Sequence, residues 1–70
     1  MTSATKRVGE TVRAQMSAQN LTQQDLAIAL GVSQQSVSRR LSGLTEWGID
    51  ELVAVADLLG TTPTELLRAS

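Results

Sequence analysis

The sequence predicts an all-α fold built from five short helices. Apolar residues recur at spacings of three and four, and no alternation of apolar and polar residues lasts long enough to indicate a strand. Tyrosine and phenylalanine, which favour strands, are absent, whereas the helix formers alanine, leucine and glutamine are frequent. A chain of 70 residues has room for one small core, so we expect residues 1–70 to form a single domain.

The first expected helix covers residues 5–19, because Val8, Val12 and Met16 recur every four residues and form one apolar stripe. Thr22 then offers an N-cap hydroxyl, with Asp25 three residues later, and this pair predicts a second helix over residues 23–30. Its expected buried residues are Leu26, Ala27 and Leu30. Gly31 ends this helix, because a glycine can turn the chain in the left-handed region without a Cβ clash.

Ser33 is the expected N-cap of a third helix that runs to about Ser42, with Gly43 as its stop. This helix has two different faces on a helical wheel. The expected core face consists of Val37, Leu41 and Leu44. The polar face consists of Gln34, Gln35, Ser38, Arg39 and Ser42.

The fourth helix is expected over residues 49–59, with Gly48 as N-cap, Glu51 three residues later and Gly60 as stop. Its expected core stripe is Leu52, Val55, Ala56 and Leu59. A threonine and a glutamate three residues apart, Thr62 and Glu65, enclose Pro63, so a short fifth helix is expected to continue through Leu66 and Leu67.

Composition excludes several classes of protein. There is no cysteine, no histidine and no glycine-rich phosphate loop, so we expect no disulfide, no metal, no cofactor, no small-molecule substrate and no enzyme activity. No apolar run approaches the ~20 residues that cross a bilayer, and the N-terminus lacks the apolar segment of a secretion signal. We therefore expect a cytoplasmic protein without a membrane partner.

Charge divides the chain into a basic and an acidic part, although the net charge is only −1. Residues 1–43 carry +3, from Lys6, Arg7, Arg13, Arg39 and Arg40 against Glu10 and Asp25. Residues 44–70 carry −4, from Arg68 against Glu46, Asp50, Glu51, Asp57 and Glu65. This division predicts a mildly basic end and an acidic end rather than a uniform surface.

The second and third helices have the features of a tight helix–turn–helix. Such a motif needs a small residue where the helices meet and a glycine in the turn, and Ala27 and Gly31 supply these. Apolar residues must clamp the pair, and the candidates are Leu26, Leu30, Val32 and Val37. The third helix carries its polar face at its N-terminal end, which is the end that enters a major groove in such motifs.

Residues 23–39, with the pattern QQDLA-(x3)-GVSQQSVSR, resemble the Cro/C1-type (XRE-like) helix-turn-helix family of phage repressors and bacterial regulators. The later pattern L-(x2)-VA-(x2)-LG-(x2)-P-(x2)-L over residues 52–66 is similar to the fourth and fifth helices of the same family. The resemblance therefore covers about residues 8–67. It implies a five-helix, lambda-repressor-like DNA-binding domain whose second and third helices form the helix-turn-helix.

The resemblance also implies a set of DNA contacts. The expected base-contacting residues are Gln34, Gln35, Ser38 and Arg39, and the expected backbone-contacting residues are Thr22, Gln23, Ser33, Ser36 and Arg40. A glutamine amide suits a bidentate contact with adenine, and an arginine suits guanine or a phosphate. Arg40 stands where many members of the family have an apolar residue. Two roles therefore stay open for its side chain, which are binding a phosphate and packing on the flank of the third helix.

Two further features depart from the family or from the helical pattern. The loop after Gly43 lacks the basic or proline residues that are common in the family. It contains Trp47, the only aromatic residue, which we expect to pack over the start of the fourth helix rather than to contact DNA or a second copy of the chain. Val53 and Leu58 lie off the expected core stripe and, with Leu67, form a candidate dimer surface.

The expected function is sequence-specific binding of double-stranded DNA by a transcriptional regulator, most simply a phage or prophage repressor, immunity repressor or Cro-like protein. The expected partners are an inverted-repeat operator and a second copy of the chain, in the bacterial host cytoplasm and associated with the nucleoid. Two alternatives stay open: a protein-binding module of the antitoxin or anti-repressor kind, and an excisionase-like architectural DNA binder. The chain could equally be the DNA-binding piece of a longer regulator.

Overall fold

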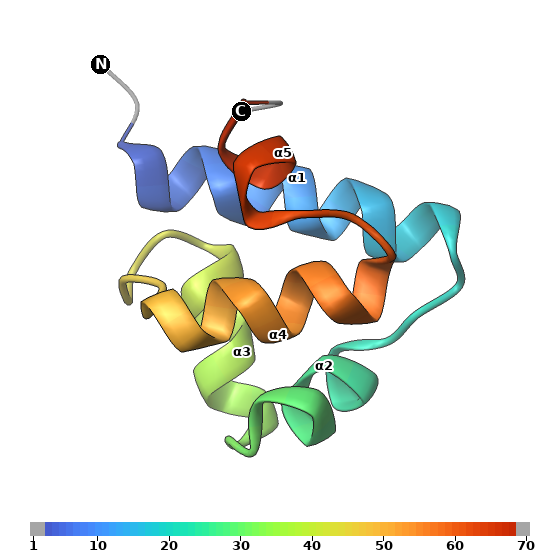
Figure 1. Cartoon of the computed structure of the whole chain (residues 1–70). Helices are drawn as coiled ribbons and strands as arrows, with labels where there is room; N and C mark the ends of the chain where they lie inside the picture. The colour runs from blue at the N-terminus through green and yellow to red at the C-terminus, as the bar shows by residue number, and fades with distance from the viewer. Residues whose placement is uncertain (1–2, 69–70) are drawn as a thin grey trace.

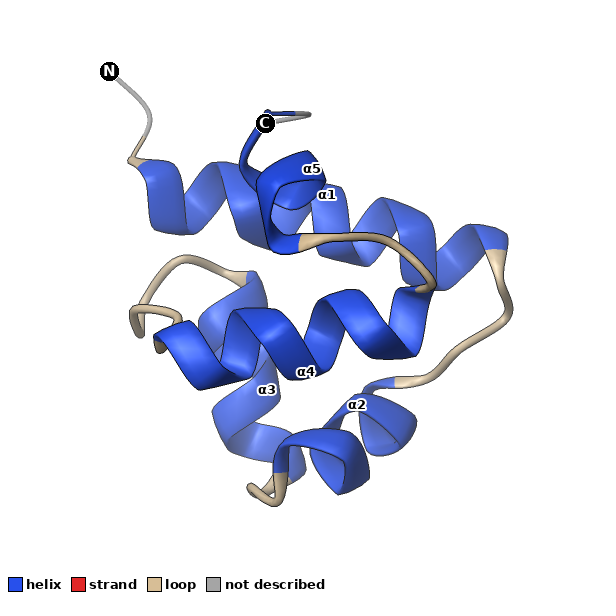
Figure 2. Cartoon of the chain, in the orientation of Figure 1, coloured by secondary structure: helices blue, strands red, loops and turns tan. Residues whose placement is uncertain are grey.

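The computed structural model describes residues 3–68, and this part of the chain is all-helical, as predicted (Figures 1 and 2). The five helices are α1 (Ala4–Ala18), α2 (Gln23–Leu30), α3 (Gln34–Leu41), α4 (Ile49–Leu59) and α5 (Pro63–Arg68). The bounds agree with the expected ones to within a residue or two. No helix among residues 3–68 is long and apolar enough to cross a membrane.

The helices surround a single apolar core. α1 packs against α3, α4 and α5, while α2 packs against α3 and α4, so α2 and α5 lie on opposite sides of the molecule (Figure 1). The core consists of Val8, Val12, Met16, Leu26, Ala27, Val37, Leu41, Val55, Ala56, Leu59 and Leu66. No polar or charged residue of the described chain is fully buried. The stability of the domain therefore depends on helix packing.

Four expectations about the core are wrong in detail. Leu44 is 80% exposed, because α3 ends at Leu41 and Gly43, with φ of +83°, turns the chain away from the helical path. Leu30 at the end of α2 and Leu52 on the expected core stripe of α4 are half-buried instead of buried. Leu58, expected on an outer dimer surface, is half-buried and packs against the core from α4.

Hydrogen bonds at the helix starts confirm most of the predicted caps. The Thr22 side chain accepts from the amide of Asp25, and the Asp25 side chain accepts from the amide of Thr22, which makes a complete capping box at α2. Thr62 Oγ1 accepts from the amide of Glu65 at 3.1 Å. The amide of Gly48 donates to Glu51 Oε1 at 2.8 Å at the start of α4. These bonds satisfy backbone N–H groups that have no partner inside a helix.

Two contacts that fix α1 are absent from the sequence-based prediction. Gly9 is buried where α1 crosses the end of α3, and a Cβ built there would lie only 2.4 Å from the carbonyl oxygen of Leu41. Gln19 Nε2 donates to the carbonyl of Leu59 at 2.9 Å and so joins the end of α1 to the end of α4. The first contact sets how closely α1 approaches α3.

Candidate nucleic-acid interface

α2 and α3 form a tight helix–turn–helix. Gly31 adopts φ of +67° at the end of α2, and the amide of Val32 donates to the carbonyl of Ala27 at 3.1 Å, so the chain turns within residues 31–33. Leu26, Ala27 and Val37 are buried between the helices, and the half-buried Leu30 and Val32 pack against the same core. The clamp predicted from the sequence is therefore present, and it holds α3 at a fixed angle to α2.

α3 presents two chemically different faces. Val37 and Leu41 are 0% and 3% exposed and join the core. Gln34, Gln35 and Arg39 are exposed, and Ser38 is half-buried beside them. Gln34 and Ser38 are four residues apart, as are Gln35 and Arg39, so the four expected base-contacting residues lie on neighbouring strips of one helix.

The long polar side chains of this face make no hydrogen bond or ion pair within residues 3–68. Arg40, in contrast, is held by several bonds, and the two serines at the start of α3 bond each other. Gln34, Gln35 and Arg39 thus keep all the donor and acceptor atoms of their side chains for an external partner. A helix surface of this kind can read the edges of bases.

The first turn of α3 combines a cap with the positive end of the helix dipole. Ser33 Oγ accepts from the amide of Ser36 at 3.1 Å and lies 3.2 Å from Ser36 Oγ, to which it is hydrogen-bonded. The capping bond satisfies one of the four free N–H groups of the first turn, and Ser33 and the first residues of α3 remain exposed. An anion such as a phosphate is favoured at this position.

The start of α2 is occupied by its own carboxylate. Thr22 Oγ1 donates to Asp25 Oδ2 at 3.0 Å, and the Thr22 amide donates to the same oxygen at 2.8 Å. The bond from the Thr22 backbone, together with that from its hydroxyl, lowers the pKa of Asp25, which is therefore ionised at neutral pH. This negative charge opposes a phosphate beside Thr22 and the half-buried Gln23, the two residues expected to bind one there.

Arg40 faces α4 instead of the exposed face of α3. Its Nε and Nη2 atoms donate to the two carboxylate oxygens of Glu51 at 2.9 and 2.8 Å, and Nη1 donates to the Ser36 carbonyl at 3.1 Å. The two side chains are only 13% and 23% exposed. The hydrogen bonds from Arg40 lower the pKa of Glu51, and the same bonds raise that of Arg40. Of the two roles left open for Arg40, the geometry favours packing beside the helix.

Sequence reasoning assigned Glu51 only to the cap of α4 and missed its bond to Arg40. The position of Arg40 is the signal that could have revealed this bond, because a charged residue at an expected apolar position requires a partner of opposite charge. Glu51 accepts from the Gly48 amide as well, so one carboxylate caps α4 and holds α3.

Comparison with known proteins agrees with this geometry. A family model described as helix-turn-helix matches residues 12–66. The fold is similar to that of the restriction-modification controller protein C.AhdI from Aeromonas hydrophila, with a TM-score of 0.79 and 24% identity over 87% of this chain and 92% of that one. It is also similar to the clp gene regulator ClgR from C. glutamicum, with a TM-score of 0.89 and 23% identity over 99% and 90% of the two chains.

A search of curated proteins finds no match. At the identities found, the two solved structures support the fold alone, whereas the family match covers most of the chain. The family and the fold are those of DNA-binding regulators, which are not enzymes. The chain belongs to the XRE-type helix-turn-helix family of DNA-binding transcription regulators.

Proposed function

We propose that this regulator is a repressor that reads the major groove of double-stranded DNA with α3. The observation that carries the proposal is the exposed face of α3, where Gln34, Gln35 and Arg39 have no partner within residues 3–68 while the opposite face is buried. Repression fits this surface, because a protein bound over a promoter blocks transcription without any further contact.

The proposed contacts follow from the chemistry of each side chain. Gln34 and Gln35 each offer an amide donor and an acceptor to adenine, and Arg39 offers two donors to guanine, with Ser38 beside them. The phosphate backbone is bound at the first turn of α3, through Ser33, Ser36 and the free N–H groups. The second contact that the resemblance implies, through Thr22 and Gln23 next to α2, is the weaker of the two, because the charge of Asp25 opposes a phosphate there. Arg40 supports α3 from the α4 side and is not one of the contacts.

We further propose that two copies bind an inverted repeat. Ile49 and Val53 are 82% and 46% exposed and lie four residues apart on α4, and Leu67 of α5 is 50% exposed. These three apolar side chains form the proposed dimer surface, which lies on the acidic part of the chain and outside the helix–turn–helix. Ile49 takes the place of Leu58 in the set expected from the sequence. Half-sites would then be centred ~34 Å apart, one helical turn of DNA.

The proposed function is tested by selecting bound duplexes from a random DNA pool with the wild-type chain and with the double variant Gln34→Ala/Gln35→Ala. We expect the wild type to enrich an inverted repeat with A·T pairs at the reading positions. Two bidentate contacts of ~1–3 kcal/mol each predict that the double variant binds that site at least ~30-fold more weakly. A control variant, Ser17→Ala/Thr64→Ala, changes two exposed polar residues on α1 and α5 and should bind as the wild type does.

Each other outcome points to a different function. An unaltered sequence preference in the double variant would show that base readout by the two glutamines is wrong. A single half-site would remove the dimer from the proposal. Bending without sequence preference would favour an architectural DNA binder, and no enrichment at all would favour a protein-binding module. The phage or prophage origin and the association with the bacterial nucleoid stay predictions.

A further inference from the structure

The loop that follows α3 has no cation for the DNA backbone. A helix in the major groove lies between two phosphate backbones, and contacts with phosphates fix its position on the duplex. At the N-terminal end of α3 the proposed contacts are Ser33, Ser36 and the free N–H groups. At the other end, residues 42–48 read SGLTEWG, and none of them carries a positive charge. A cation at this end of α3 must come from another element.

The first turn of α1 packs against this loop (Figure 1). Gly43 adopts φ of +83°, and a Cβ built on it would lie 3.0 Å from Lys6 Cβ, 3.2 Å from Lys6 Cα and 3.3 Å from Lys6 Cγ. The backbone of Lys6 is fixed from within α1 as well, because its amide donates to Oγ of the N-cap Ser3 at 3.1 Å. The stem of Lys6 is therefore held beside the end of α3.

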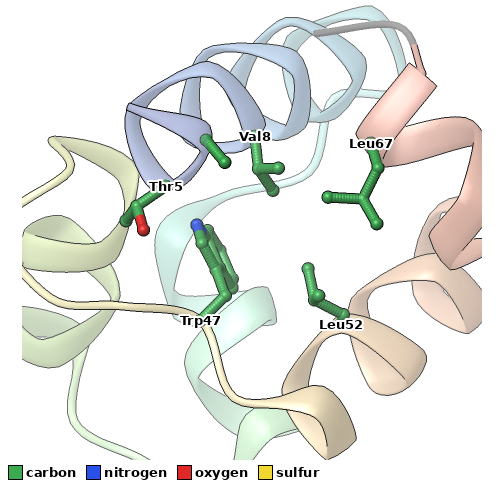
Figure 3. Close-up of a pocket in the computed structure, with 6 residues that line it drawn as sticks. Thr5, Val8, Trp47, Leu52 and Leu67 are labelled. Carbon is green, nitrogen blue, oxygen red and sulfur yellow. The ribbon is translucent and has the colours of Figure 1, made fainter. Parts of the chain in front are cut away.

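A second contact joins the same two segments. Figure 3 shows the indole of Trp47 turned toward Thr5 of α1, with Leu52 of α4 on its other side, and these three residues line one small apolar hollow. Trp47 is half-buried and packs against the core over the start of α4, as expected from the sequence. The first turn of α1, the loop and the start of α4 thus form one packed junction, with the exposed Lys6 on its surface.

The ammonium group of Lys6 is free to bind an anion. Its side chain makes no hydrogen bond and no ion pair in the described part of the chain. Glu10 on α1 and Glu46 in the loop are both exposed, and neither is paired with it. The first turn of α1 contains no acidic residue, although a helix N-terminus favours one. The positive charge of Lys6 is therefore not neutralised by its own helix.

Lys6 lies close to the reading face. The amide of Leu44 donates to the carbonyl of Arg39 at 2.9 Å, and the amide of Gly43 donates to that of Arg40 at 3.2 Å, so Arg39 and Gly43 belong to the same last turn. One helical turn advances about 5.4 Å, which places the stem of Lys6 about one turn beyond Arg39, the last of the proposed base contacts. Two cations from different helices thus border the C-terminal end of the reading face.

We propose that Lys6 binds a phosphate of the DNA backbone at the C-terminal end of α3, in place of the cations that the loop lacks. A lysine suits this role, because its ammonium is a compact charge on a flexible stem and contacts a phosphate without reading the sequence. With Ser33 and Ser36 at the other end, α3 is then held at both ends in the groove. This inference rests on the proposed function, since it adds a contact to the same DNA complex.

The test compares Lys6→Gln with Arg7→Gln, on the duplex selected by the wild type and on one of unrelated sequence. Glutamine keeps the Cβ and Cγ atoms that pack on Gly43 and removes the charge. Arg7 is the matched control, because it is exposed on the same turn of α1 but is turned about 100° from Lys6 around the helix axis.

We expect Lys6→Gln to weaken binding to both duplexes alike, by about fivefold to tenfold at ~100 mM salt, and to reduce the log–log salt slope by ~0.9 per monomer. Arg7→Gln should change the slope by less than about half as much, because salt screens a charge that touches no phosphate. Lys6→Arg keeps the charge and should bind as the wild type does.

A second measurement locates the contact. Single phosphates of the selected duplex are replaced by uncharged methylphosphonates, one at a time, and each duplex is bound by the wild type and by Lys6→Gln. The base pair that Arg39 reads is identified by the change of preference in Arg39→Ala. We expect one phosphate near that base pair whose replacement weakens binding by the wild type but not by Lys6→Gln.

The outcomes separate this inference from the proposed function. If every replacement weakens wild type and Lys6→Gln by the same factor, or if Lys6→Gln and Arg7→Gln reduce the slope equally, Lys6 is not a phosphate contact while sequence-specific binding stands. A loss of stability in urea without a change of slope would mean that Lys6 only stabilises the end of α3, and would overturn the inference in the same way. A wild type that enriches no duplex would overturn both proposals.

Discussion

Replacing Gly9 with alanine should destabilise the domain, although the same change stabilises most helices. Alanine in a helix interior is favoured over glycine by ~1 kcal/mol, because glycine loses more backbone freedom on folding. At position 9 the added Cβ would lie 2.4 Å from the Leu41 carbonyl oxygen, 2.9 Å from its carbon and 3.0 Å from the Arg40 oxygen. All three atoms belong to the backbone, so no side-chain rotation relieves the contact.

The size of the effect follows from how far the helices must move. A carbon and an oxygen that are not bonded approach to about 3.2 Å at the closest, so α1 and α3 must separate by nearly 1 Å at their crossing. Such a shift loosens Val8 and Val12 of α1 against Val37 and Leu41 of α3, which are all buried. Overpacking of this kind costs ~1–3 kcal/mol. After the helix preference is subtracted, we expect a net loss of up to ~2 kcal/mol in the free energy of unfolding.

Urea unfolding, followed by the fluorescence of the single Trp47, measures this loss. Ala14→Gly is a matched control, because Ala14 is exposed on the same helix and should lose only the ~1 kcal/mol of helix preference. If Gly9→Ala were instead more stable than the wild type, the close crossing of α1 and α3 would be wrong. A second consequence is specific to function: a displaced α3 should bind DNA more weakly even at temperatures where the variant is fully folded.

Three further predictions concern the core, the Arg40–Glu51 pair and the surface charge. Leu41→Ala should lower the free energy of unfolding by ~2–5 kcal/mol because Leu41 is buried, and Leu44→Ala by less than ~0.5 kcal/mol because Leu44 is exposed. Similar losses at the two sites would contradict the observed end of α3. Because Arg40 holds the pKa of Glu51 below its ordinary 4.5 in the folded state, the stability from this bond is present above pH 4.5 and is lost as the pH falls through the lowered value. Glu51→Gln should therefore be less stable than the wild type by ~1–3 kcal/mol at pH 7, and the difference between them should shrink in urea titrations at pH 3. With few exposed basic residues, the affinity for DNA should fall with a log–log salt slope of about −3 to −4.5 per monomer, and a slope near zero would mean that phosphates are not bound.

The helices and the reading face could be predicted from the sequence because their signals are local. A cap such as Thr22 with Asp25, or a glycine such as Gly31 after an apolar stripe, acts within one turn of the chain. The polar face of α3 is visible as residues on one side of a helical wheel. The same local reasoning wrongly predicts Leu44 in the core. A helical wheel assumes that the helix continues, whereas Gly43 ends it.

Contacts between distant segments could not be predicted in the same way. The bond from Gln19 to the carbonyl of Leu59 joins residues 40 positions apart and has no local signature. The partner of Arg40 depends on how α3 lies against α4, and this is known only once both are packed on the core. Gly9 is a weak sequence signal, because a glycine inside a helical pattern can mark a site where another segment packs closely against the helix. The sequence does not show which segment that is.

α3 is held from two sides by contacts that leave its reading face free. On one side the backbone of Leu41 lies against Gly9 of α1, and on the other the guanidinium of Arg40 binds Glu51 of α4. Both contacts are at the C-terminal part of α3, whereas Ser33 and Gly31 fix its N-terminal end through the turn. A rigid helix presents its side chains to DNA with less loss of freedom than a mobile one, so binding energy is not consumed in ordering it. On this reasoning Glu51→Gln should weaken binding to all DNA sequences alike, whereas Gln34→Ala should alter which sequence is preferred.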